Sequence, residues 1–180
     1  MDPDGSEPTQ LTGDLRARDS SPGSVRPQQL RMNEYYTWPT WSSDGRRLAA
    51  SHVIVEESRT KITLQVLDAR TGLSDIIYEN SQADLVADGA PHYIYWAPIG
   101  DQVSFLASTP DGLGLFVWDG TSGSPAAQIS LGAPLYYQWS KDAQAMALHV
   151  GSELIWASPL SSASSRQSLQ TAGNFRVPAV

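Results

Sequence analysis

Histidine is the side chain of this sequence best suited to acid–base chemistry or metal binding near neutral pH. His52, His92 and His149 are widely separated, and the patterns H-E-x-x-H, Gly-x-Ser-x-Gly, the P-loop and the dinucleotide-binding glycine motif are all absent. The chain has no cysteine, so it offers no thiolate nucleophile, thiolate zinc ligand or disulfide. We therefore expect surface or turn-facing histidines, no catalytic residue, no metal site and no cofactor.

Acidic residues gather in predicted loops at Glu56–Glu57 and at Asp84 and Asp88. Paired carboxylates hydrolyse glycosidic bonds when the fold holds them at a fixed separation. These four have no identifiable partner in the sequence, so glycoside hydrolysis stays open as an alternative that the sequence does not favour. The acidic segment 2–5 lacks the ligand spacing of a calcium loop and predicts a β-turn instead.

Composition and charge restrict the partners. The 180 residues carry 12 basic and 19 acidic side chains, a net charge of −7, with Lys61 and Lys141 as the lysines. Nucleic acids and anionic membranes need clustered Lys and Arg, so we expect neither partner. No apolar run approaches the roughly 20 residues that span a bilayer, and the acidic first residues predict no signal peptide.

Six Trp, seven Tyr, 14 Gly and 12 Pro favour short strands and tight turns, and hence an all-β fold.

A segment led by tryptophan occurs three times and organises these elements. Trp41, Trp96 and Trp139 are 55 and 43 residues apart, and repeats of roughly 40 to 50 residues are typical of β-propeller blades. Positions after the tryptophan also correspond, in the sets Asp44 and Asp142; Gly45 and Gly100; Leu48, Val103 and Met146; Ala50, Phe105 and Leu148. An aromatic residue precedes each tryptophan, as Tyr36, as Tyr93 or Tyr95, and as Tyr136 or Tyr137.

The copies differ in the turn that follows the tryptophan. Ile99 stands where the first copy has Asp44, and Ala143 stands where it has Gly45. Glycine adopts positive φ without steric cost. We therefore predict that the second and third turns do not share the backbone geometry of the first, with Asp101 as a substitute one position further along.

We interpret Trp41, Trp96 and Trp139 as residues that pack between blades, because apolar residues repeated in register are typical of core positions. The alternative is a platform on which sugar or base rings stack, which needs exposed rings beside basic or amide groups.

The motif Trp41–Ala49, Trp-Ser-Ser-Asp-Gly-Arg-Arg-Leu-Ala, closely resembles the W-S-P-D-G-K-R-I-A pattern of TolB-type (WD40-like) β-propeller repeats. The segment 1–12 is similar to the hairpin that closes such a blade, and 175–180 is similar to the start of another repeat. The resemblance implies a bacterial propeller, and a periplasmic or extracytoplasmic setting.

The predicted fold is an all-β propeller fragment of about three four-stranded antiparallel blades, with incomplete blade stubs at both ends. The predicted divisions are a closing hairpin of a preceding blade at 1–12, a loop or linker at 13–34, blades at 35–80, 91–132 and 133–173, and the start of a further blade at 174–180. Within the last of these blades, a Ser-rich loop is predicted over 161–165.

The favoured function is a non-catalytic scaffold that binds a protein partner or a small ligand through its blade loops, chiefly 13–31 and 79–90, since loops on a rigid scaffold commonly carry binding. One alternative is the accessory propeller of a prolyl-oligopeptidase-type serine peptidase. Another is the sensory ectodomain of a larger signalling protein. Fold likeness alone does not choose among these three.

Overall fold

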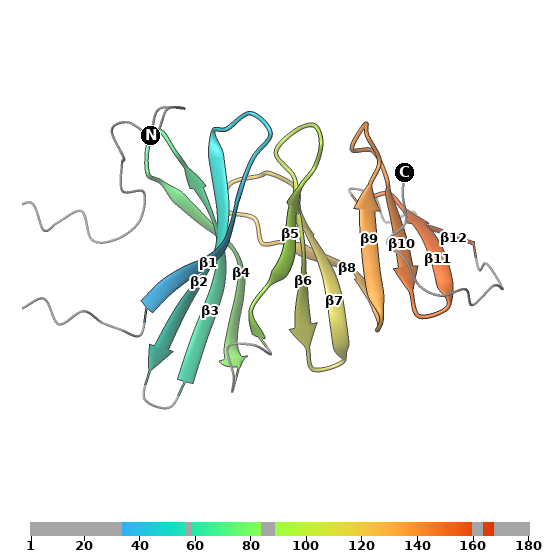
Figure 1. Cartoon of the computed structure of the whole chain (residues 1–180), viewed down its shortest axis with the longest axis horizontal. Helices are drawn as coiled ribbons and strands as arrows, with labels where there is room; N and C mark the ends of the chain where they lie inside the picture. The colour runs from blue at the N-terminus through green and yellow to red at the C-terminus, as the bar shows by residue number, and fades with distance from the viewer. Residues whose placement is uncertain (1–33, 57–58, 84–88, 160–163, 168–180) are drawn as a thin grey trace, which may run out of the picture.

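The computed structural model describes residues 34–56, 59–83, 89–159 and 164–167. These residues form three four-stranded antiparallel sheets, each with its strands in chain order (Figure 1). The first sheet contains β1 (Glu34–Trp41), β2 (Arg47–Glu56), β3 (Arg59–Asp68) and β4 (Ser74–Ala83). The second contains β5 (His92–Trp96), β6 (Val103–Thr109), β7 (Gly112–Trp118) and β8 (Ala127–Leu131). The third contains β9 (Leu135–Trp139), β10 (Met146–Val150), β11 (Glu153–Ala157) and β12 (Ser164–Gln167).

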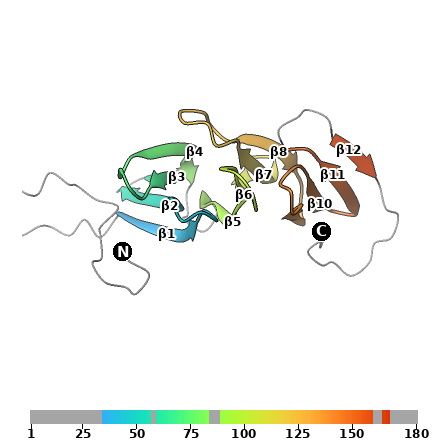
Figure 2. The ribbon, with the colours of Figure 1, turned by 90° about the horizontal axis from the view of Figure 1, so that it is seen from above.

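The sheets stand side by side as blades. Figure 2 shows β4, β8 and β12 on one side of the molecule and β1 and β5 on the other. In the third sheet β9 occupies the edge opposite β12. We call β1, β5 and β9 the inner strands and the sheets blades 1, 2 and 3. Blades that are simple meanders packed face to face are the architecture of a β-propeller, so the predicted all-β fold with three four-stranded blades is confirmed.

The residues that the repeat aligns with one another occupy equivalent positions in the three sheets. Trp41 lies opposite Leu48, Trp96 opposite Val103, and Trp139 opposite Met146. Strands β6 and β7 of the second sheet are buried on both faces, as strands that pack between two neighbouring sheets require.

Two apolar clusters join the blades. Between blades 1 and 2, aliphatic residues of β3 pack against the rings of Phe105, Phe116 and Trp118. Between blades 2 and 3, Leu106 and Leu115 pack against Tyr137, Trp139 and Met146. Blade 2 therefore buries one apolar face against blade 1 and the other against blade 3.

Two predicted loop boundaries are wrong. The loop predicted to begin at Glu79 starts later, because β4 continues to Ala83 and Glu79 pairs with Thr63 of the long strand β3. The Ser-rich loop predicted over 161–165 overlaps β12, where Ser164 and Ser165 pair with β11. The predicted hairpin at 1–12, most of the linker at 13–34, and the further blade at 174–180 lie outside the described residues.

The turn prediction for the third blade is wrong as well. Ala143 adopts φ 58°, beside φ 69° for Gly45, and the hydrogen bonds match. Ser42 Oγ donates to Asp44 Oδ1 at 2.6 Å, and Ser140 Oγ donates to Asp142 Oδ1 at 2.6 Å. The shared Ser-x-Asp hydrogen bonds hold an alanine in the left-handed region despite its Cβ. Within the described residues, no helix is long and apolar enough to cross a membrane.

Candidate functional site

Strands β1 and β5 each carry a β-bulge at the same place, three residues before the repeat tryptophan. The pairing shifts between Thr37 and Thr40 in β1 and between His92 and Tyr95 in β5. The bulged residues Trp38 and Tyr93 have φ of 55° and 49°. Large aromatic residues seldom adopt positive φ, and such strained positions persist only where the surrounding structure enforces them.

The bulges turn aromatic side chains outward. Trp38 is 60% exposed and Tyr93 is 56% exposed. Bulges commonly redirect a side chain beside a functional site. In β9 the corresponding residue is Tyr136, which pairs regularly with His149. All three inner strands thus carry an aromatic residue at this position.

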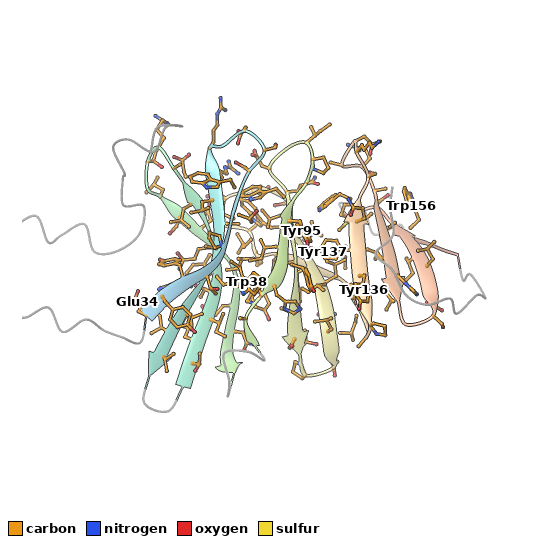
Figure 3. All side chains as sticks on the ribbon, in the orientation of Figure 1. Glu34, Trp38, Tyr95, Tyr136, Tyr137 and Trp156 are labelled. Atoms are coloured by element: carbon orange, nitrogen blue, oxygen red, sulfur yellow. The ribbon has the colours of Figure 1, made fainter. Side chains whose placement is uncertain are left out.

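Together with the exposed ring of Tyr95, these residues form what we call the inner-strand aromatic row, composed of Trp38, Tyr93, Tyr95 and Tyr136. Figure 3 shows Trp38 on β1, Tyr95 on β5 and Tyr136 on β9, distributed over three neighbouring strands. The row therefore crosses both blade boundaries and does not belong to a single loop.

A cavity of about 130 Å³ opens within this row between β5 and β9. It is lined by Tyr93, Tyr95, Leu106, Leu135, Tyr136, Tyr137 and Gln138. The rings of Tyr95 and Tyr137 meet edge to face, with centroids 5.9 Å apart and planes at 67°. The rings of Tyr93 and Tyr95 lie 6.5 Å apart at 32°. We call this cavity the tyrosine pocket.

Tyr137 fixes the shape of the tyrosine pocket. Its hydroxyl donates a hydrogen bond to the carbonyl oxygen of Tyr93, the residue at the bulge of the neighbouring blade. Burial raises the pKa of the Tyr137 hydroxyl far above its ordinary value, because a phenolate would lose its hydration. Tyr137 therefore stays neutral and remains a donor, which ties blade 3 to the strained backbone of blade 2.

His52 belongs to a separate network in blade 1, and the prediction of a surface histidine is wrong for it. Its side chain is only 11% exposed and stacks on Tyr36 with ring centroids 4.4 Å apart. Nε2 lies 2.8 Å from Glu34 Oε1, and Nδ1 lies 2.9 Å from Gln65 Nε2. Both ring nitrogens are engaged, so the network positions side chains and leaves neither nitrogen available as a base.

The three histidines do not come together, since His52, His92 and His149 lie in different blades. Among the residues that the structure describes, no group of three or more His, Cys, Asp or Glu side chains could hold a metal ion. Glu57, Asp84, Asp88 and the side chain of Glu56 lie outside the described part of the chain.

A second cavity, of about 620 Å³, lies at the turns of blade 1 and is lined by Asp44, Gly45, Arg46, Arg47, Asp68, Ala69, Arg70 and Asp101. The hydroxyl of Ser42 and the N–H of Arg46 lower the pKa of the Asp44 carboxyl. Thr71 lowers that of Asp68 through its N–H and hydroxyl. Both carboxylates therefore stabilise the turns to which they belong.

Asp101 does not replace the missing turn aspartate of blade 2. Its Oδ1 lies 3.7 Å from Arg47 Nη1 of blade 1, and the same guanidinium lies over the ring of Trp118, 5.9 Å from its centroid. The arginine therefore joins the two blades by charge and by cation–π contact. Because acidic and basic groups neutralise one another around this cavity, we do not favour it as the binding site.

The repeat tryptophans have three different environments. Trp139 is 4% exposed and donates its indole N–H to Ser104 Oγ at 2.7 Å. Trp96 donates to the carbonyl of Thr40 at 3.0 Å. Trp41 is 51% exposed, so the prediction that it is buried between blades is wrong. Trp96 and Trp139 each pack on the preceding blade, whereas no described residue forms a sheet on that side of β1.

Sequence reasoning came close to the aromatic row without resolving it. The sequence shows an aromatic residue before each tryptophan. It suggests Tyr36 in the first copy, however, and leaves two candidates in each of the other copies. The structure selects the position three residues before the tryptophan, which is Trp38, Tyr93 and Tyr136. A fixed spacing of three would have found all three residues.

Comparisons with known proteins add context for the fold. No protein-family model matches the sequence, and no curated protein matches it. The β-propeller domain of the Trilobed protease from Pyrococcus furiosus is a similar solved structure, with a TM-score of 0.47 and 11% identity over 69% of this chain and 38% of that chain.

Two further solved structures are similar. One comes from a structural and mechanistic study of two prolyl endopeptidases, with a TM-score of 0.46 and 14% identity over 74% of this chain and 22% of that chain. The other is a putative 6-phosphogluconolactonase from Bacteroides uniformis, with a TM-score of 0.37 and 10% identity over 74% of this chain and 53% of that chain. The chain thus spans roughly a fifth to a half of the length of these three proteins. At such identities the likeness concerns the fold alone.

Proposed function

We propose that this chain is a non-catalytic β-propeller segment that binds a ligand or protein partner on its inner-strand aromatic row. The observation that carries the proposal is the pair of equivalent bulges, which hold Trp38 and Tyr93 at positive φ with their rings exposed. Backbone strain of this kind costs about 1–3 kcal/mol per residue. A role for the exposed rings would account for its presence in two blades.

The chemistry of the row supports binding. Trp and Tyr are the residues that contribute most to many binding interfaces, because they bury a large area and lose few rotamers. Their position on strands of packed blades keeps the rings fixed before a ligand arrives, which lowers the entropy lost on binding. This proposal moves the binding surface from the loops predicted at 13–31 and 79–90 to the inner strands.

The described side chains also support a non-catalytic role. His52 is held by Glu34 and Gln65 through both of its nitrogens. Asp44 and Asp68 accept hydrogen bonds within their own turns. These groups serve the structure of blade 1, and each lacks the free partner that a general base or nucleophile needs.

We also propose that the blades are of the TolB type. The support is the motif Trp41–Ala49 and the structural role of its residues in this chain. Ser42 and Asp44 close the turn, and Gly45 supplies positive φ. The same bonds recur at Ser140 and Asp142, so the motif encodes a turn used more than once.

Mapping of bound small molecules by NMR tests the binding proposal. The full chain, labelled with ¹⁵N and ¹³C, is titrated with a fragment library that contains aromatic, amide and ammonium compounds. We expect fragments to perturb the resonances of Trp38, Tyr93, Tyr95 and Tyr136 together. Exposed apolar residues away from the inner strands, Leu73 and Ile76, provide the matched comparison. Fragment hits that gather at Leu73 and Ile76, or that avoid the inner strands, would contradict the proposal.

A further inference from the structure

The tyrosine pocket has the composition of an aromatic cage. Four of its seven lining residues are tyrosines, contributed by the adjacent inner strands β5 and β9, and Leu106 and Leu135 complete the apolar wall. The rings are inclined to one another, at 67° for Tyr95 and Tyr137. Inclined rings around a small cavity present several π surfaces to one bound group, whereas parallel rings would clamp a single flat one.

The size of the pocket restricts its occupant to one small group. A volume of about 130 Å³ is well below the ~300–1,000 Å³ of pockets that enclose a whole drug-sized ligand. The pocket therefore suits a compact terminal group of a ligand, with the rest of the ligand lying along the aromatic row.

The charges favour a cation. The lining residues include no Lys, Arg or His that would repel one, and the chain carries a net charge of −7, which attracts cations over a distance. The negative faces of tyrosine rings bind organic cations, and quaternary ammonium groups are the ligands best known for this mode of binding. Their methyl groups also match the apolar wall of Leu106 and Leu135.

We propose that the tyrosine pocket binds a quaternary ammonium group of about the size of trimethylammonium. This inference rests on the proposed binding role of the inner-strand aromatic row and specifies the ligand chemistry of one part of it. A sugar ring fits less well, because it needs several amide or carboxylate partners and Gln138 supplies one side-chain amide among the lining residues. A neutral branched alkyl group shares the shape but gains nothing from the ring quadrupoles.

The decisive experiment compares two probes of equal shape. Choline carries a trimethylammonium group, and 3,3-dimethyl-1-butanol carries a neutral tert-butyl group in its place. Both are titrated into the labelled full chain and followed by NMR at the resonances of Tyr93, Tyr95 and Tyr136. We expect choline to bind roughly 3- to 30-fold more tightly than the alcohol, which corresponds to a cation–π contribution of about 0.5–2 kcal/mol.

Two variants locate the effect. Tyr95→Leu removes a ring face and keeps an apolar side chain, so it should weaken choline binding by about threefold or more and change binding of the alcohol by less. Tyr95 is about half exposed, so its replacement by leucine should not unfold the chain. Unfolding would also weaken the binding of both probes and not of choline alone. Trp156→Leu replaces an exposed ring of β11 outside the pocket and should leave both affinities unchanged.

The outcomes separate this inference from the proposed function. Equal affinities for the two probes at the tyrosine residues would overturn the ammonium assignment and leave the binding surface in place. If choline does not bind but fragments still perturb the aromatic row, the ammonium assignment is likewise overturned and the binding surface stays in place. Absence of any ligand at the inner strands would overturn both.

Discussion

The two blade interfaces of this protein use one repeated tryptophan in two ways. Trp96 of blade 2 donates its indole N–H directly to the carbonyl of Thr40 in blade 1. Trp139 of blade 3 donates to Ser104 Oγ, and that hydroxyl donates in turn to the carbonyl of Tyr95. Thr40 and Tyr95 occupy the same repeat position, immediately before Trp41 and Trp96. The final acceptor is therefore equivalent, and blade 2 adds a hydroxyl relay.

The difference between the direct and the relayed hydrogen bond follows from one residue in the second strand of each blade. Ser104 lies opposite Tyr95, and the corresponding residue opposite Thr40 is Ala49. Alanine leaves the carbonyl open to the indole, whereas serine places a hydroxyl between them. A single side chain thus decides whether the tryptophan bonds to the backbone directly, and the blade repeat tolerates both arrangements because each satisfies the buried N–H.

The interfaces also differ in what supports the tryptophan. Between blades 1 and 2, the stacked rings of Phe105 and Phe116 of blade 2, 5.4 Å apart, pack against aliphatic residues of blade 1. The N–H of Ala126, just before β8, also donates to the carbonyl of Ile77 in β4 at 2.7 Å. Between blades 2 and 3, two side chains of β9 donate hydrogen bonds to blade 2, Trp139 to Ser104 and Tyr137 to the carbonyl of Tyr93. We therefore expect the second interface to be more sensitive to loss of its tryptophan.

The largest expected effect is the loss of Trp139. Trp139→Ala removes a buried ring and should lower the free energy of unfolding by about 3–5 kcal/mol. Trp41→Ala removes the same ring type from a half-exposed position and should cost about 1 kcal/mol or less. Urea unfolding followed by circular dichroism measures both. Equal losses in the two variants would show that Trp41 is buried in solution.

Removal of the hydroxyl relay should have the next largest effect. Ser104 is fully buried, so Ser104→Ala leaves the Trp139 indole N–H without its acceptor and should cost about 1–3 kcal/mol. Ser108→Ala, on an exposed position of the same strand, is the matched control and should be near neutral. A near-neutral result for Ser104→Ala would mean that the indole moves to the Tyr95 carbonyl and makes the two interfaces alike.

The blade repeat could be predicted from sequence because its information is local. The alternation of apolar residues acts within a few residues, and the recurring tryptophan marks each copy of that local pattern along the chain. These features aligned Leu48, Val103 and Met146 as equivalent positions, and each of them pairs with its tryptophan in the structure. The direct and relayed hydrogen bonds were not predictable, because they depend on how closely two blades approach.

The candidate site was harder to predict because it depends on tertiary structure. Nothing in the residue types of Trp38 or Tyr93 indicates positive φ, which sequence patterns associate with glycine, asparagine and aspartate. Ala143 shows the same limitation, since the fold enforces a geometry that its residue type disfavours. The exposure of Trp41 was not predicted, because an argument from the sequence repeat assigns the same neighbours to every copy.

The strained alanine gives a smaller predicted effect. Ala143→Gly relieves the left-handed strain but makes the unfolded chain more flexible, so we expect a net gain of about 0.5–1 kcal/mol. The reciprocal change in blade 1, Gly45→Ala, should cost about 1 kcal/mol. Space is not the cause, because a Cβ at Gly45 meets no heavy atom within 4 Å. A loss of stability in Ala143→Gly would show that the packing of the buried Ala143 Cβ in the apolar cluster between blades 2 and 3 outweighs the strain.

The smallest expected effect is the acid sensitivity of the two Ser-x-Asp turns. Hydrogen bonds from Ser42 and Ser140 lower the pKa of Asp44 and of Asp142 below the ordinary 3.8. A carboxyl with a depressed folded-state pKa adds stability above its unfolded pKa, and loses that stability as the pH falls through the folded value. These two turns should therefore weaken below about pH 4.

Replacement of both aspartates by asparagine tests this effect. The double variant Asp44→Asn and Asp142→Asn should show a smaller loss of urea resistance between pH 7 and pH 3 than the wild-type chain. Asp111→Asn is the control, because Asp111 bonds to Thr109 through its backbone N–H and not through its carboxylate. Blade 2 has Ile99 at this turn position and should contribute nothing to the effect. An unchanged pH dependence in the double variant would mean that solvent screens these exposed turn bonds, and that blades 1 and 3 gain no more from their turns than blade 2 does.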